Sequence, residues 1–129
     1  MAKFEIKHAF LIHGIIGFLF GIGFMVIPTP ITTLMGLSLG DDGIILARIC
    51  GVLIFGLGML AFGARKEPHS IMRQQIMLAF IVIYALDTLF SLLLFDLTNF
   101  MVWGLILLHA VLVVVYGYFF IQNRGKYFL

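Results

Sequence analysis

Long apolar stretches alternate with three short polar breaks along this chain of 129 residues. A helix needs about 20 residues to cross the roughly 30 Å of membrane hydrocarbon. Four stretches reach that length, and short connections make neighbouring helices antiparallel. The pattern predicts an all-α fold, a polytopic membrane four-helix bundle, up-down-up-down, formed as a single transmembrane domain over residues 1–129. The expected spans are about 8–27, 43–64, 74–95 and 99–121.

The polar breaks carry residues that begin helices. Asp41 or Asp42 is expected to cap the second span and Asp96 or Thr98 the fourth, because their side-chain oxygens accept hydrogen bonds from free backbone N–H groups. The break after the first span, residues 28–42, is longer and rather apolar. Three placements stay open for it: along the outer membrane interface, as a short re-entrant helix, or packed over the outer end of the bundle.

The composition agrees with a membrane protein. Hydrophobic residues make up 63% of the chain and charged residues 11%, whereas soluble domains are about 25% charged. The net charge is only +2 and the basic residues are scattered, so nucleic acid is not expected as a partner. Cys50 is the single cysteine, which excludes an internal disulfide and a dithiol redox pair.

The basic residues predict the orientation in the membrane. Of the eight Lys and Arg residues, all except Arg48 lie on the same side of the predicted bundle. Because Lys and Arg accumulate on the cytoplasmic side of membrane proteins, both the N- and C-termini are expected in the cytoplasm, with the protein in the cell inner (plasma) membrane. The residues on this side are Lys3, Lys7, Arg65, Lys66, Arg73, Arg124 and Lys126.

Two charged residues stand inside apolar stretches, Arg48 in the second and Asp87 in the third. An ion in hydrocarbon costs a few kcal/mol, so such residues are candidates for pairing or function. Both lie equally far from the middle of the connection between their spans. Counted from the outer ends, their depths differ by about 5 Å, which an arginine side chain can bridge. A buried ion pair that fixes helix register, a ligand or substrate site, and two residues without mutual contact all stay open.

Polar residues around Asp87 recur at helical spacing and share one stripe of the third span. His109 lies about 15 Å into the fourth span from the outer side, near the depth of Asp87. It is interpreted either as a residue that hydrogen-bonds between helices or as a proton acceptor. The candidate site is thus an intramembrane polar cluster in the outer half of the bundle, acting as an ion pair or as a ligand site. Its members are Arg48, Asp87, His109, Tyr84, Thr88 and Ser91.

Glycines in the first two spans are expected to let helices approach closely. Gly17 and Gly21 form a small-xxx-small pattern, which is typical of close helix contacts in membranes. Packing within the chain is the favoured interpretation, and a homodimer face is the alternative. The candidate packing positions are Gly14, Gly17, Gly21, Gly51 and Gly58.

Several of these features occur together in a known group of proteins. Pro28 follows the first span, Gly36 lies in the outer connection, Ala47-Arg48-Ile49-Cys50-Gly51 opens the second span, and Asp87 stands in the third. This layout resembles the DoxX-like small four-helix bacterial membrane proteins, over nearly the whole chain. The resemblance implies the four-helix fold and, for some members, an association with quinone- or thiol-linked redox systems. With one cysteine, this chain lacks the thiol pair.

No catalytic constellation is found in the sequence. No two His, Cys or carboxylate residues within a span have metal-ligand spacing, and His13 and His109 differ in depth by about 12 Å, too far for one haem. No catalytic residue, metal or cofactor is therefore expected. The favoured function is a non-enzymatic integral membrane protein of accessory, structural or lipid-binding type. The alternatives are a small proton-coupled transporter using Asp87, and a redox component that binds a quinone or lipid head group near Arg48, Asp87 and His109.

The expected partners follow from the same composition. The lipid bilayer surrounds the spans, and a lipid or quinone is the candidate ligand of the polar cluster. A second copy of the chain or another membrane protein remains a candidate partner, because glycine patterns do not distinguish packing within one chain from packing between chains.

Overall fold

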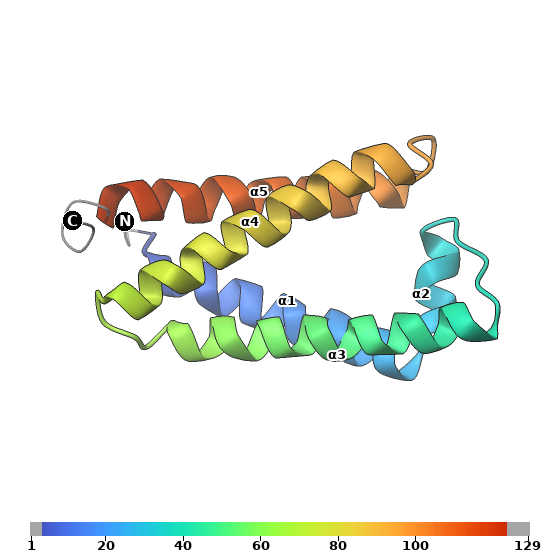
Figure 1. Ribbon diagram of the computed structural model, residues 1–129, viewed down its shortest axis with the longest axis horizontal. Coiled ribbons are helices and arrows are strands. Elements are labelled where there is room, and N and C mark those ends of the chain that lie inside the picture. Colours follow the sequence, from blue (N-terminus) through green and yellow to red (C-terminus); the bar gives the residue numbers. More distant parts are fainter. Residues whose placement is uncertain (1–3, 124–129) are drawn as a thin grey trace. The chain divides into compact units, whose positions relative to one another are not determined.

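The computed structural model describes residues 4–123 and contains five helices in that range (Figure 1). Four of them are long and apolar enough to cross a membrane. The predicted all-α fold with four spans is thus confirmed, and every predicted span end lies within three residues of a helix end. The helices are α1 (Ile6–Val26), α2 (Pro28–Leu34), α3 (Asp41–Ala64), α4 (Ile71–Leu94) and α5 (Phe100–Asn123).

The chain divides into two compact units. The first, called here the α4–α5 unit, comprises residues 4–9 and 66–123 of the described range; the second, the α1–α3 unit, comprises residues 10–65. Each unit holds two long helices joined by a short connection, and α2 belongs to the α1–α3 unit. The two units are described separately below.

Close backbone contact joins α1 and α3 within their unit. A Cβ atom added to Gly17 would lie 2.7 Å from the Cα atom of Gly58, and one added to Gly21 would lie 2.7 Å from the backbone nitrogen of Phe55. A Cβ atom added to Gly51 would lie 2.8 Å from the backbone nitrogen of Met25. Gly17, Gly21 and Met25 of α1 contact Gly58, Phe55 and Gly51 of α3, in that order. Residue numbers fall along α3 as they rise along α1, so the two helices run antiparallel. No side chain larger than hydrogen fits at these positions without moving a backbone.

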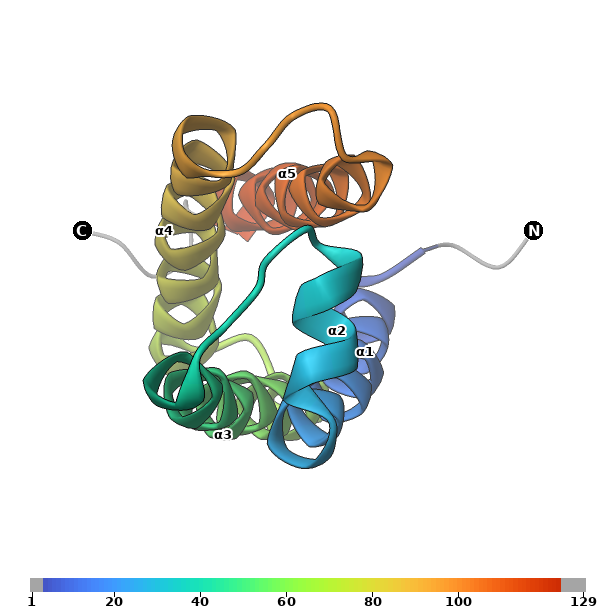
Figure 2. The same ribbon diagram turned by 90° about the vertical axis from the view of Figure 1, so that its right-hand side faces the viewer.

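The break after the first span contains the short helix α2, which links the end of α1 to the start of α3 (Figure 2). Pro28 occupies its first helical position, where a missing N–H costs nothing. The helix ends at Leu34 with Met35 as its C-cap, and the next residue is Gly36, whose φ of 79° suits glycine. The N–H groups of Gly36 and Leu37 donate to the carbonyls of Thr33 and Thr32, which is the Schellman end of a helix.

In the α4–α5 unit, the two long helices pack side by side (Figures 1 and 2). Met77, Phe80 and Tyr116 are completely or almost completely buried, and the Phe80 and Tyr116 rings lie 5.3 Å apart. At one end of the pair, the Gln74 side-chain amide donates to the Asn123 carbonyl over 2.7 Å. Aromatic packing in the middle and a hydrogen bond at the end therefore hold α4 against α5.

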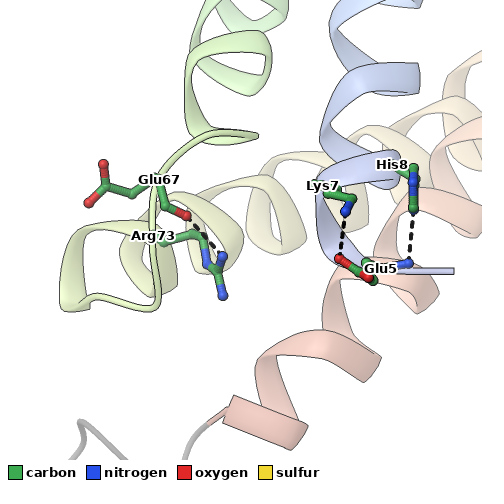
Figure 3. A network of polar contacts seen from close by, with 5 residues as sticks. All are labelled: Glu5, Lys7, His8, Glu67 and Arg73. Atoms are coloured by element: carbon green, nitrogen blue, oxygen red, sulfur yellow. Dashed lines mark hydrogen bonds and ion pairs between the residues drawn. The ribbon is translucent and has the colours of Figure 1, made fainter. Parts of the chain in front are cut away.

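The connection into α4 is held by its own polar groups. The Ser70 hydroxyl oxygen accepts a hydrogen bond from the Arg73 backbone N–H and donates to the Glu67 carboxylate. Figure 3 shows the Arg73 guanidinium donating to the Glu67 carbonyl, at 2.9 Å. Because its oxygen accepts the Arg73 backbone N–H, Ser70 is the N-cap of α4.

Figure 3 also shows a separate ion pair before the start of α1 and in its first turn, where Lys7 pairs with Glu5 at 3.0 Å.

The expected caps of α3 and α5 are wrong. The N-cap of α3 is Gly40, without a side-chain cap, while Asp41 and Asp42 lie in the first turn, where a negative charge still favours the helix dipole. At α5 the Asn99 side chain accepts from the Met101 N–H at 2.9 Å, so Asn99 is the cap. Asp96 and Thr98 do not cap α5, because they bond to each other in the turn before it.

This turn predicts a pH dependence outside the membrane spans. Two donors of Thr98 lower the pKa of Asp96: first the backbone N–H, 2.9 Å from Oδ1, and then the hydroxyl at 2.8 Å. Because the folded-state pKa is depressed, the stabilisation of the turn is present above the ordinary Asp value of about 3.9 and is lost as pH falls through the lowered value. A carboxyl NMR titration should show this low midpoint. Thr98→Ala, which keeps the N–H, should move the midpoint only part of the way back, and an ordinary midpoint in the wild type would contradict the assignment.

Candidate functional site

Arg48 and Asp87 lie equally far from one end of their own helices. Arg48 stands seven residues after the first residue of α3, and Asp87 seven residues before the last residue of α4. At 1.5 Å per residue, each lies about 10 Å along the axis from that end of its helix. The difference of about 5 Å expected from the sequence disappears, because α3 begins two residues earlier than predicted and α4 ends one residue earlier.

Both charged side chains are exposed in the structure, not buried. Arg48 belongs to the α1–α3 unit and Asp87 to the α4–α5 unit. Among the described residues of its own unit, neither has a hydrogen bond or an ion pair. The pairing of Arg48 with Asp87 therefore stays a prediction.

The residues of the polar stripe of α4 differ in how far they are buried. Tyr84 and Ser91 are buried, Thr88 is half-buried and Asp87 is exposed. Asp87 follows Tyr84 by three residues, which places it about 60° around the helix, whereas Thr88 lies only about 40° away. Asp87 is thus at the edge of the stripe, and the Thr88 hydroxyl donates to the Tyr84 carbonyl at 2.7 Å.

His109 meets this stripe from α5. Its imidazole stacks on the Tyr84 ring, with 5.2 Å between centroids and 27° between planes. Asp87 lies within electrostatic range of both Tyr84 and His109. The Nδ1 atom of His109 is buried and has no hydrogen-bond partner among residues 4–123. Tyr84, Asp87 and His109 consequently form one group, called here the α4–α5 polar face.

The chemistry of this face is that of a binding surface. It combines an exposed carboxylate with two stacked aromatic rings and a buried imidazole nitrogen that has no partner among residues 4–123. An unpaired polar atom in a low-dielectric environment costs about 1–3 kcal/mol, so a hydrogen-bonding ligand would be stabilised here. Within the described range, no group of three or more His, Cys, Asp or Glu is arranged to hold a metal ion.

Two polar residues near the start of α4 are buried in the protein. Arg73 and Gln74 are the third and fourth residues of the helix and have 7% and 1% exposure. Gln74 stands three residues before the buried Met77, so helical spacing carries it onto the same packed side. This burial was not predicted from the sequence, and the spacing from Met77 is the signal that indicates it.

Trp103 adds an aromatic group near the N-terminal end of α5. Its indole N–H donates to the Leu97 carbonyl at 2.9 Å, and the residue is 41% exposed. This combination is typical of tryptophan at a membrane interface, where the ring lies in apolar surroundings and the N–H finds a polar partner.

Similarity to known proteins gives no further guide to this site. A search of protein-family models, of characterised proteins and of solved structures found no match to the chain.

Proposed function

We propose that this small multi-pass membrane protein is non-enzymatic, of accessory or lipid-binding type, and that an ion pair between Arg48 and Asp87 fixes the register of its spans. One observation carries the proposal. Two opposite charges stand equally far, about 10 Å, from the start of α3 and the end of α4 respectively, and each lacks a polar partner among the described residues of its own unit.

The energetics favour pairing over two separate charges. Each ion at membrane depth costs about 2.5–3.5 kcal/mol or more, and opposite charges at equal depth can cancel much of that cost. The arginine guanidinium presents a planar fork of donors that matches a carboxylate, and its long stem tolerates a small offset between helices. A pair of this kind would fix the register between α3 and α4. Apolar side chains alone fix helix register only weakly.

A double-mutant cycle tests the pair. Arg48→Gln and Asp87→Asn should each destabilise the protein by about 2 kcal/mol, because each leaves one uncompensated ion in the membrane, while the double variant should cost clearly less than the sum. Unfolding by SDS in mixed micelles measures all three. Lys66→Gln, which removes an exposed charge outside the spans, is the control. Additive effects of Arg48→Gln and Asp87→Asn would contradict the proposal.

The lipid-binding part of the proposal concerns the α4–α5 polar face. The buried Nδ1 atom of His109 and the nearby carboxylate of Asp87 support it as the place where a polar head group binds. Purified protein that turned over a lipid or a quinone would contradict the non-enzymatic assignment. Proton-coupled flux in proteoliposomes that is lost in Asp87→Asn would instead favour a transporter.

We also propose an orientation of the protein in the membrane and its membership of a protein group. The basic residues at one side support cytoplasmic termini in an inner membrane. Membership of the DoxX-like group is supported by the same positions that suggested it: Pro28 begins α2, Gly36 ends its Schellman motif, and Gly51 faces the backbone of α1. Labelling of single cysteines introduced at Ser38 and His69 in a Cys50→Ser background, from either side of the membrane, tests the orientation.

A further inference from the structure

We propose that the α4–α5 polar face binds the ammonium group of a cationic amphiphile. The inference rests on the proposed function in one respect, since the ammonium would take the place there assigned to the Arg48 guanidinium. Two features support it: the set of groups in the face, and a charge that has no counter-ion among the described residues of its own unit.

The negative charge of Asp87 has no cation near it within the α4–α5 unit. The described basic residues of that unit are Lys7, Lys66 and Arg73. Arg73 precedes Asp87 by 14 residues of the same helix, which separates them by about 21 Å along its axis. Lys66 lies farther still, before α4 begins, and Lys7 pairs with Glu5 at 3.0 Å. A cation that compensates Asp87 must therefore come from outside this unit.

The remaining groups of the face also suit a cation. Tyr84 is buried and its ring stacks on His109, so these rings add π-electron density close to the carboxylate but no open face. Thr88 already uses its hydroxyl hydrogen on the Tyr84 carbonyl, so its oxygen has only lone pairs to offer. The Nδ1 atom of His109 is buried, so the exposed Asp87 carboxylate is the group that the ammonium contacts directly. An anionic head group would be repelled here, and a neutral one would leave Asp87 uncompensated.

The side chains around Asp87 favour a ligand whose charged group carries an apolar chain. Leu86 and Phe90, which flank Asp87 on α4, are exposed apolar side chains, 47% and 53% accessible. A compact inorganic cation would have to shed its water at this depth without enough oxygen ligands to replace it. An alkylammonium ion keeps its alkyl chain among these side chains while its N–H groups reach the carboxylate.

Dodecylamine is the probe for this site, with dodecanol as the uncharged control of equal chain length. The protein is labelled with ¹⁵N-histidine in zwitterionic micelles at about pH 7.5, where a primary amine is charged. The His109 signal is assigned by its absence in His109→Gln. Dodecylamine should shift that signal and dodecanol should not. Asp87→Asn should weaken binding at least about tenfold, and Asp87→Glu should keep most of it.

The Arg48→Gln variant distinguishes the ammonium site from the Arg48–Asp87 ion pair. If the pair forms, Arg48→Gln should tighten dodecylamine binding several-fold, because it removes a competitor of the same chemistry. An unchanged affinity in Arg48→Gln, with binding still lost in Asp87→Asn, would overturn the pair and leave the ammonium site standing. Equal responses to dodecanol and dodecylamine, or unchanged binding in Asp87→Asn, would overturn the site itself. Asp96→Asn should bind like the wild type.

Discussion

Gly17→Ala is expected to destabilise the α1–α3 hairpin by about 2 kcal/mol, the usual scale of overpacking in a well-packed interior. The added Cβ would lie 2.7 Å from the Cα and 3.1 Å from the backbone nitrogen of Gly58. Neither atom belongs to a side chain that can rotate away, so the two helices must separate. Separation also weakens the contacts at Gly21 and Gly51 along the same interface.

Gly56→Ala is the matched control. Gly56 lies in α3, and a Cβ added there meets no atom within 4 Å. Both substitutions bring the same gain in helix propensity, so the difference between them isolates the α1–α3 contact. Unfolding by SDS in mixed micelles, followed by circular dichroism, measures both variants. Equal stability of Gly17→Ala and Gly56→Ala would show that the close approach does not stabilise the hairpin.

The glycine positions illustrate what sequence can predict in a membrane protein. Lipid is as apolar as leucine, so helix contact depends on close packing, and small residues at a spacing of four mark where it occurs. Gly17 and Gly21 have this spacing, and both lie where α1 approaches α3. The sequence does not say which glycines remain open: Gly56 and Gly58 are two residues apart, yet only Gly58 touches α1.

The ends of the spans were predictable because charged and turn-forming residues interrupt otherwise apolar sequence. The local geometry of those ends was not. Asp96, Thr98 and Asn99 are all good capping residues, and the choice among them depends on backbone dihedrals that a residue pattern does not contain. Asp96 and Thr98 bond within their own turn, which leaves Asn99 beside the free N–H of Met101.

The polar cluster was predicted in outline from depth and spacing. The sequence indicated that Tyr84 and His109 lie at related depths, and the structure stacks their rings. It also placed Asp87 in one stripe with Tyr84 and Ser91, which are buried, but Asp87 is exposed. A stripe defined by spacing has a width of about 100°, and the rotation of α4 decides which of its edges faces the neighbouring helix. That rotation follows from the large buried residues Met77 and Phe80, which occupy its centre.

Phe80→Ala is expected to cost about 2 kcal/mol and to disturb the polar face one turn away. Phe80 is fully buried, and its ring lies 5.3 Å from Tyr116 and 6.1 Å from Tyr84. In a membrane the substituted residue stays in apolar surroundings after the helices separate, so the transfer part of the usual penalty largely vanishes. The void remains, and at about 24 cal/mol per Å³ a cavity of about 80 Å³ accounts for the expected loss.

Phe90→Ala removes the same side chain from an exposed position of α4 and should change stability by less than about 0.5 kcal/mol. The two variants differ in a second measurement as well. Because Phe80 supports the Tyr84 ring on which His109 stacks, Phe80→Ala should shift the His109 imidazole NMR signal, and Phe90→Ala should shift it less. A His109 signal unchanged in Phe80→Ala would mean that the stack is held without the aromatic packing behind it. The polar face would then depend on local contacts of Tyr84 and His109 alone, and its geometry would not require the α4–α5 core.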